Sequence, residues 1–277
     1  MIGIDMYRFR KRDLRDKVAL ITGASSGIGA ETARRLARGG LRVVLVARRA
    51  DRLAMLLNEI KASGRECMIL PLDLAKESSR FELFDCIQST YGSVDVLVNN
   101  AGFGWYGHYA NMPLDVAREM IQVNISSLVH LTSLFLPAMI KRRSGHIINV
   151  GSIAGSLPSQ GVALYSATKS FIDGFTTALF RELVGSGVYV SVVKPGPVMT
   201  EFCSNAANLT AGLRMPTEQV GILPEKVADA IWSLLRWPRR VLYVPHILGI
   251  TPWIEACFGW LMDRIGPMLL NRKQLTS

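Results

Sequence analysis

Short apolar segments recur along the chain and alternate with longer segments in which apolar residues repeat at a helical spacing. The short segments lack the polar alternation of a half-exposed strand, so they predict strands buried on both faces. They cover residues 18–22, 42–47, 67–72, 94–98, 145–150 and 188–193. The helical spacing covers residues 31–37, 51–63, 81–91, 114–140 and 171–182. This alternation predicts an α/β domain whose mainly parallel sheet is covered by helices on both faces.

The turns that follow these strands carry most of the candidate chemistry. Ligands of parallel α/β sheets bind beyond the carboxyl ends of the strands, where such turns come together. The residues at these ends include Gly23, Arg48, Asn100, Ser152 and Pro195. Their shared position predicts one binding site.

A glycine-rich turn joins the first strand to the first helix. It places Gly23, Gly27 and Gly29 in a TGxxxGxG spacing. Glycines let the backbone approach a pyrophosphate, and the free N–H groups and dipole of a helix start favour the anion. An ordinary tight turn is the alternative, but the position between strand and helix favours a phosphate site.

The second strand ends in Arg48 and Arg49. In dinucleotide-binding folds, a residue roughly twenty positions beyond the glycines contacts the adenosine ribose, and an acid there selects NAD. An arginine suits a 2′-phosphate instead, so NADP(H) is the expected cofactor. The alternative is a solvated basic pair at the start of the helix at residues 51–63.

Polar side chains also follow the third and fourth strands. Asp73, which precedes Leu74, could accept a hydrogen bond from an adenine amino group or cap the next helix. In Asn100-Ala101-Gly102, the small residues leave room for a cofactor and the amide can bond strand-end backbone groups. An ordinary Asn-rich turn is the alternative for the latter motif.

Tyr165 and Lys169 are four residues apart, which places them one turn apart on one helix face. A nearby ammonium favours the ionised form of a phenol, so Lys169 lowers the pKa of Tyr165 and makes it a usable general acid and base. Such pairs also arise by chance. Asn124, in an apolar helical region, needs hydrogen-bond partners because burying a free amide is costly.

Together these motifs resemble the short-chain dehydrogenase/reductase family. The resemblance spans residues 17–240 and implies a Rossmann-type, doubly wound sheet of about seven strands, the last at residues 241–244. It implies NAD(P)-linked carbonyl reduction or alcohol oxidation. The motifs that carry it are Thr22-Gly23-xxx-Gly27-x-Gly29, Asn99-Asn100-Ala101-Gly102, Asn124, Ser152, Tyr165-xxx-Lys169 and Pro195-Gly196.

The resemblance implies a role for each matching residue. Tyr165 protonates the carbonyl oxygen, and Lys169 assists it and holds the nicotinamide ribose. Ser152 polarises the carbonyl, Asn124 keeps a water-linked proton path to the lysine, and Thr200 binds the nicotinamide carboxamide. The other cofactor contacts are Gly23, Ser25, Ser26, Gly27, Ile28, Gly29, Arg48, Asp73, Leu74, Asn100, Ala101, Gly102, Pro195, Gly196 and Val198.

Composition narrows the partners. Hydrophobic residues make up 49% before the 24 glycines are counted, whereas ordinary domains reach ~45–50% with glycine included. The surplus favours a lipophilic ketone, aldehyde or alcohol, bordered by residues 103–107 and 201–215. The net charge is +10, but the basic residues are scattered and form no stripe interleaved with aromatic residues. This pattern disfavours a nucleic acid as the partner. Four dispersed cysteines without a Cys/His cluster indicate a reducing compartment and no metal site.

The ends of the chain differ from its centre. Residues 1–16 form a basic tail without the apolar core of a signal peptide, and a catalytic domain is expected at residues 17–244. Residues 245–277 form an apolar extension that could close the pocket, pack in a homodimer or homotetramer, or contact a membrane surface. Residues 241–262 approach the ~20 residues of a membrane span, although their prolines argue against one straight helix. A cytoplasmic enzyme is expected, with membrane association as an open alternative.

Overall fold

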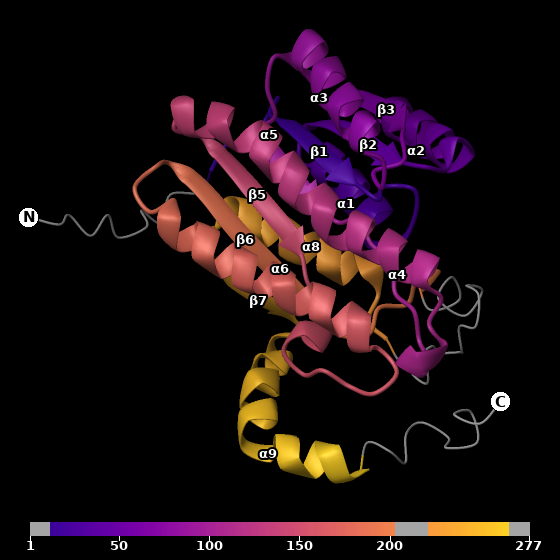
Figure 1. Ribbon diagram of the computed structural model, residues 1–277. Coiled ribbons are helices and arrows are strands. Elements are labelled where there is room, and N and C mark those ends of the chain that lie inside the picture. The colour runs from indigo at the N-terminus through magenta and orange to yellow at the C-terminus, as the bar shows by residue number, and fades with distance from the viewer. Residues whose placement is uncertain (1–11, 203–220, 266–277) are drawn as a thin grey trace, which may run out of the picture.

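The computed structural model describes residues 12–202 and 221–265 of the chain, and one sheet runs through them. Its seven strands lie in the order β3-β2-β1-β4-β5-β6-β7, and every neighbouring pair is parallel (Figure 1). The strands are β1 Val18–Thr22, β2 Arg42–Ala47, β3 Cys67–Pro71, β4 Val96–Asn99, β5 Gly145–Val150, β6 Val188–Pro195 and β7 Val241–Val244. The expected sheet is confirmed, including its seventh strand.

Helices cover both faces of this sheet. One face carries α1 (Gly27–Arg38), α2 (Ala50–Ala62) and α8 (Pro224–Arg236), and the other carries α3 (Glu77–Tyr91), α5 (Ser127–Lys141) and α6 (Ala163–Glu182). Neighbouring strand residues face opposite cores, because side chains alternate along a strand. Leu20 therefore packs with the second set of helices and Ile21 with the first.

The strand order reverses at β1, which lies between β2 and β4. The chain builds β1, β2 and β3 outward in one direction and then returns to place β4 on the other side of β1. A crevice opens at such a reversal, beyond the carboxyl ends of the two central strands, and this is where doubly wound folds bind ligands. The glycine turn after β1 and the Asn99-Asn100 turn after β4 both lie there.

One long helical region, Leu114–Lys141, is apolar enough and long enough to cross a membrane by composition and length alone. It consists of α4 (Leu114–Ile121), a π-helical turn η2 (Gln122–Ser126) and α5. Leu131, Phe135 and Met139 of α5 pack in the core beneath the sheet, which accounts for much of its apolar character. The π turn was not expected from the sequence and contains Asn124; π turns inside helices occur frequently at functional sites.

The described part of the N-terminal region packs on the amino end of the sheet. Arg12 Nη1 lies 3.3 Å from His146 Nδ1, and its guanidinium lies 4.9 Å from the centre of the Tyr189 ring. Leu14 is buried in the core. The last residues of the expected tail therefore belong to the folded body.

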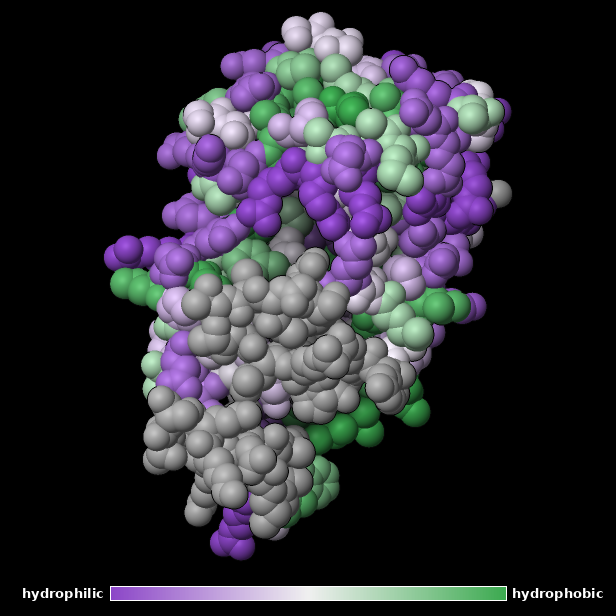
Figure 2. All heavy atoms as spheres, turned by 90° about the vertical axis from the view of Figure 1, so that its right-hand side faces the viewer, coloured by the Kyte–Doolittle hydropathy of each residue, from purple (hydrophilic) through white to green (hydrophobic). Residues whose placement is uncertain are grey.

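After β7 the chain forms a short helix, η4 (His246–Ile250), and then α9 (Thr251–Ile265). Figure 1 shows α9 leaving the body of the molecule at its lower end. In Figure 2, hydrophilic side chains dominate the upper part of the face, and a group of hydrophobic side chains lies at its lower right. The alternative of one span over residues 241–262 does not hold, because the segment is divided among β7, η4 and α9.

Candidate active site

Two adjoining cavities lie beyond the carboxyl ends of the central strands. Their volumes are about 540 Å³ and about 390 Å³, and they share Gly23, Ser26 and Gly102 as walls. The sequence-predicted residues are divided between them, except Gly29 and Asn124, which line neither. The first cavity has Ser25, Arg48, Asp73, Leu74 and Ala101; the second has Gly27, Ile28, Asn100, Ser152, Tyr165, Lys169, Pro195, Gly196, Val198 and Thr200.

The glycine turn between the cavities is tightly packed. Gly23 and Gly27 have φ values of 65° and 53°, in the left-handed region that favours glycine. A methyl group on Gly29 would lie 2.3 Å from the carbonyl oxygen of Gly23. Asn100 Nδ2 donates to the carbonyl oxygens of Thr22 and Gly23 at 2.8 and 3.2 Å. The expected strand-end role of Asn100 is thus seen, and it holds the turn at the start of α1.

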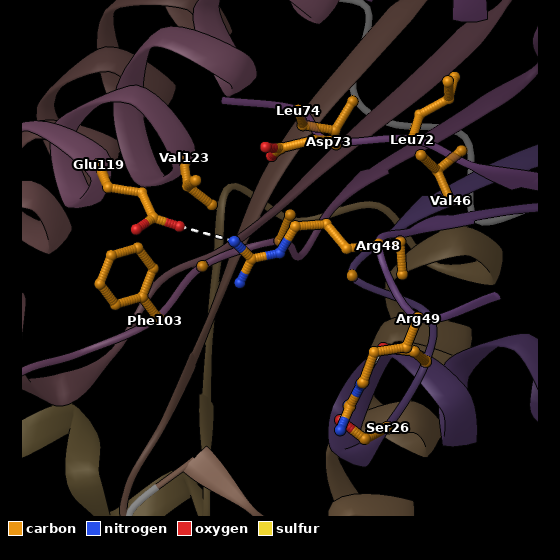
Figure 3. A pocket seen from close by; sticks show the side chains of 15 residues that line it. Ser26, Val46, Arg48, Arg49, Leu72, Asp73, Leu74, Phe103, Glu119 and Val123 are labelled. Carbon is orange, nitrogen blue, oxygen red and sulfur yellow. Dashed lines mark hydrogen bonds and ion pairs between the residues drawn. The ribbon is translucent and has the colours of Figure 1, made fainter. Parts of the chain in front are cut away.

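Arg48 and Arg49 leave β2 in different directions (Figure 3). Arg48 reaches across the first cavity, and its Nη1 lies 2.7 Å from Glu119 Oε1 of α4. Arg49 turns toward the glycine turn, where its Nη2 donates to Ser25 Oγ at 3.1 Å and to Ser26 Oγ at 2.6 Å. Both guanidinium groups therefore face the same cavity and can meet an anion there.

Asp73 follows β3 at the wall of the first cavity. Its Oδ1 accepts a hydrogen bond from the Ala75 N–H at 3.1 Å. Helix α3 begins after an N-cap at Lys76, so the alternative that Asp73 caps this helix is wrong. The bond to Ala75 uses one lone pair, and the carboxylate keeps acceptor capacity toward the cavity.

Ser152, Tyr165 and Lys169 meet at the wall of the second cavity. Ser152 follows β5 and caps the short helix η3 (Ile153–Gly155), where its Oγ accepts from the Ala154 N–H at 3.1 Å. Tyr165 and Lys169 lie in the first half of α6, so their predicted helical setting is confirmed. Lys169 Nζ lies 5.6 Å from the centre of the Tyr165 ring.

Lys169 is buried, and its Nζ donates to the carbonyl oxygen of Val150 at 2.9 Å. Burial disfavours the charged form and lowers the pKa of Lys169 to about 8, while the negative charge of Asp173 opposes this effect. The lysine can therefore gain or lose its proton close to neutral pH.

Asn124 satisfies its amide entirely within the fold. Its Oδ1 accepts from the Phe103 N–H at 3.0 Å, and its Nδ2 donates to the Phe103 carbonyl at 3.0 Å and to Thr168 Oγ1 at 3.1 Å. A methyl group on Gly102 would lie 3.1 Å from Asn124 Oδ1 and 3.8 Å from Lys169 Nζ. The amide and the ammonium thus approach the same glycine.

The segment after β6 covers the second cavity. Thr200 packs over the glycine turn, since a methyl group on Gly27 would lie 2.9 Å from Thr200 Cγ2. Val198 pairs with Ile222 in an isolated parallel bridge. The Phe202 ring lies 5.4 Å from the Tyr165 ring, measured between centroids. The segment thereby brings an apolar ring next to the phenol.

Residues expected to border the substrate are only partly found there. Trp105 is 3% exposed and packs in a small core with Val116 and Met120, so it lines neither of the two cavities, contrary to expectation. Phe103 lines the first cavity instead. In the second expected segment, Phe202 lines the second cavity, and residues 203–215 lie outside the described residues.

The acidic partners of the two arginines were missed from the sequence. Glu119 lies 71 positions from Arg48 in the chain, and Glu201, which lies 2.8 Å from Arg49, is separated from it by 152 positions. No local spacing links such residues. Their pairing depends on how α4 and the segment after β6 fold over the cavities.

Comparison with known proteins agrees with this geometry. The family model described as short chain dehydrogenase matches residues 17–209. Ketoacyl reductase HetN from Nostoc sp. is 36% identical over 225 residues, covering 80% of this chain and 76% of the relative.

Two solved structures are similar throughout the domain. A metagenomic short-chain oxidoreductase in complex with NADP is 34% identical, has a TM-score of 0.71 and covers 84% of this chain and 97% of its own. A short-chain dehydrogenase from Sphingobium yanoikuyae in complex with NADPH is 29% identical, has a TM-score of 0.78 and covers 89% and 95%. The chain therefore belongs to the short-chain dehydrogenase/reductase family and is an oxidoreductase.

Proposed function

We propose that this protein is an NADP(H)-dependent oxidoreductase that transfers hydride between nicotinamide and a lipophilic ketone, aldehyde or secondary alcohol. The observation that supports this proposal best is the meeting of Ser152, Tyr165 and Lys169 at one cavity that adjoins the glycine turn. A hydroxyl, a phenol and an ammonium there can bind and protonate a carbonyl oxygen.

The residues present fit a dinucleotide. The two cavities meet at the glycine turn, whose packing leaves no room for a Cβ at Gly29. The basic first cavity suits an adenosine with a 2′-phosphate, which Arg48 and Arg49 can bind. The second cavity suits the nicotinamide end, where Lys169 would hold the ribose and Thr200 the carboxamide.

When bound, the nicotinamide supplies or accepts the hydride. In the reductive direction, Tyr165 donates its phenolic proton to the carbonyl oxygen as negative charge develops there. Ser152 donates a hydrogen bond to the same oxygen; its contact with Ala154 uses a lone pair of Oγ and not its hydrogen. Lys169 stabilises the phenolate that remains.

Proton return to Tyr165 runs through Lys169 in this proposal. Asn124 lies behind the cavity wall with its Oδ1 near the same glycine as the lysine ammonium. Two of its hydrogen bonds tie the π turn to Phe103 after β4, and the third ties it to Thr168 of α6. We therefore propose that Asn124 maintains a water-linked path to the lysine rather than contacting the substrate.

The substrate class follows from the walls of the second cavity. Apart from Ser152, Tyr165 and Lys169, these include apolar side chains that offer no strong hydrogen-bond donor or acceptor, among them Ile153, Leu157, Val162 and Phe202. Such walls favour an apolar body next to the reacting carbonyl. HetN is a ketoacyl reductase by name, which is one chemistry compatible with such walls.

An alternative is a cofactor-sensing protein of the same fold with weak turnover. The complete set of Ser152, Tyr165 and Lys169 argues against it. A panel of lipophilic ketones, aldehydes and alcohols, followed by NADPH absorbance, tests the proposal. Turnover of an activated ketone would support the enzyme, whereas cofactor binding without turnover across the panel would favour the alternative.

We also propose that the chain forms a homodimer or homotetramer. Large apolar side chains remain exposed on the outer side of the long helical region and of α6: Ile121, Val129, Ile140 and Phe171 are 36–41% exposed. Covering such residues is the usual reason for association. Light scattering of the purified protein tests this proposal.

A membrane surface is the partner that we propose for α9. Trp253, Phe258 and Trp260 are 68%, 54% and 60% exposed. At about 100° per residue, Phe258 lies roughly 140° around the helix from Trp253. A lipid phase can surround side chains that point in several directions, and aromatic rings favour the membrane interface. None of the described residues of α9 lines either cavity, so closure of the pocket by this helix is not supported.

A further inference from the structure

A largely buried ion pair lies behind Lys169, among residues to which the proposed function assigns no role. Lys194 Nζ of β6 lies 2.5 Å from Asp173 Oδ2 of α6, and the two side chains are 5% and 22% exposed. Lys194 also donates to Ser156 Oγ and lies 5.1 Å from the centre of the Tyr243 ring. Burying two charges is weak evidence for a gain in stability, so another reason for the pair is worth seeking.

Asp173 extends the line of Tyr165 and Lys169 along α6. Residues four apart are neighbours on one helix face, so a phenol, an ammonium and a carboxylate follow one another at successive turns. Lys194 places a second ammonium beyond the carboxylate. Asp173 Oδ1 is buried and has no hydrogen-bond partner among the described residues, so this oxygen is not used by the contact with Lys194. The negative charge of Asp173 favours the ammonium form of Lys169.

The pair also joins elements that carry the site. Ser156 is the C-cap of η3, and Ser152 is its N-cap. Two glycines make room for the carboxylate beneath this turn. A methyl group on Gly151 would lie 3.3 Å from Asp173 Oδ1, and one on Gly155 would lie 2.8 Å from Asp173 Oδ2. The ion pair therefore ties β6, α6 and the Ser152 turn together at one point.

We infer that Asp173 and Lys194 form a positioning pair that keeps Lys169 protonated and fixes it relative to Tyr165 and Ser152. This inference rests on the proposed function. Neither member of the pair lines a cavity. Both act through Lys169.

The surroundings of Lys169 offer no second acid for this task among the described residues. Tyr165 and Asp173 face it from α6, and Lys194 lies beyond Asp173 on β6. From β5, the Val150 carbonyl oxygen accepts a hydrogen bond from Lys169 Nζ. The π turn contributes the neutral amide of Asn124. Asp173 is thus the group whose charge balances the buried ammonium.

The test is a titration of the Tyr165 phenol in the protein without cofactor. The ultraviolet difference absorbance of tyrosinate is recorded against Tyr165→Phe, so that one phenol is followed. Asp173→Asn is expected to move this titration upward by about one pH unit, because Lys169 then loses its proton more readily and stabilises the phenolate less. A second readout is NADP⁺ affinity by calorimetry, which should weaken at neutral pH.

Lys194→Met tests the other partner, and it retains the length of the side chain. It is expected to shift the titration in the same direction, because a buried carboxylate without its cation takes up a proton. Lys194→Arg should restore the wild-type value. The double variant Asp173→Asn/Lys194→Met should shift no further than Asp173→Asn alone, since Lys194 then has no carboxylate to hold.

A matched control removes an ion pair outside the site. Arg35 and Asp229 join α1 and α8 at 2.7 Å, and Asp229→Asn should leave the titration unchanged. An unshifted phenol in folded Asp173→Asn would overturn the inference, as would an equal shift in Lys194→Arg and Lys194→Met. If the phenol shifts but Tyr165→Phe retains turnover, the proposed function fails instead.

Discussion

The guanidinium of Arg48 lies 2.7 Å from the carboxylate of Glu119 across the first cavity. Their side chains are 62% and 38% exposed, and exposed pairs of this kind contribute only ~0–1 kcal/mol. A phosphate can therefore replace the carboxylate at little cost. The contact holds Arg48 over the cavity without blocking it as a 2′-phosphate ligand.

Cofactor preference is predicted to depend on Arg48. The unmodified protein should prefer NADPH, and Arg48→Asp should weaken NADPH by roughly 10–100-fold, because a hydrogen bond to a charged group contributes about 1.5–3 kcal/mol. The kcat/KM with NADH should fall only slightly or should rise. Glu119→Gln is the matched control. It removes the carboxylate that pairs with Arg48, so it should strengthen NADPH binding slightly. The measurement is kcat/KM with each cofactor; equal values for both cofactors in the unmodified protein would sink this prediction.

The pH dependence of cofactor binding should follow Lys169. Its pKa is lowered to about 8, so the ammonium is present below that pH and is lost as the pH rises through it. NADP⁺ affinity should therefore fall as pH rises above about 8. Lys169→Met, which keeps an unbranched side chain, should weaken binding and abolish this dependence, and turnover should fall too. Calorimetry at several pH values measures the NADP⁺ affinity. If the pH dependence persists in Lys169→Met, another group causes it and the prediction is wrong.

The linkage to stability has the opposite direction. A buried lysine with a lowered pKa releases its proton earlier in the folded state than in the unfolded state. Between pH 8, about the pKa of Lys169 in the folded protein, and pH 10.5, the ordinary lysine pKa, the unfolded state therefore binds more protons than the folded state. Lys169 should contribute a gain in the free energy of unfolding as pH rises through this window. Chemical denaturation of wild type and Lys169→Met should show this contribution as a difference in slope.

Gly29→Ala is predicted to open the glycine turn and abolish cofactor binding while the sheet remains folded. The added methyl would lie 2.3 Å from the Gly23 carbonyl oxygen and 2.6 Å from Asn100 Nδ2. Gly174→Ala is the control, because a methyl there meets nothing within 4 Å; as an exposed helical glycine, it should stabilise the protein by about 0.5–1 kcal/mol. Retained NADP⁺ affinity in Gly29→Ala would show that the turn does not cradle the phosphates.

The fold was largely predictable from the sequence, because each buried strand is a continuous apolar run and each helix has its own period. The turns at the strand ends also predicted that Gly23, Ser152 and Pro195 share one site, and all three line the second cavity. The π turn at Asn124 was not predictable, since one inserted residue hardly changes a helical pattern.

Contacts between segments that are far apart in the chain could not be predicted from the sequence either. Glu119 reaches Arg48, and Asp173 reaches Lys194, through the packing of α4 and α6 on the sheet. Trp105 was expected to border the substrate because it follows the Asn-rich turn. The structure buries it instead, since α4 covers it with Val116 and Met120.

The role of α9 can be tested with liposomes. Truncation after Ile250 removes α9 and keeps η4, whose Leu248 packs against Gly196. The full chain should co-sediment with liposomes at low salt and the truncated chain should not. Trp253→Ser/Trp260→Ser should weaken binding without changing the length. If both chains stay in the supernatant and light scattering shows the full chain alone to be oligomeric, α9 is an oligomer contact and the membrane proposal is wrong.

The most direct test of the proposed function is the turnover of Tyr165→Phe with the best substrate from the panel. The change deletes one hydroxyl and keeps the ring beside Phe202, so NADP⁺ affinity and the melting temperature should change little. NADPH oxidation should fall by ~10²–10⁴-fold, the usual contribution of a general acid or base. Near-wild-type oxidation by a folded, cofactor-binding Tyr165→Phe protein would contradict the mechanism.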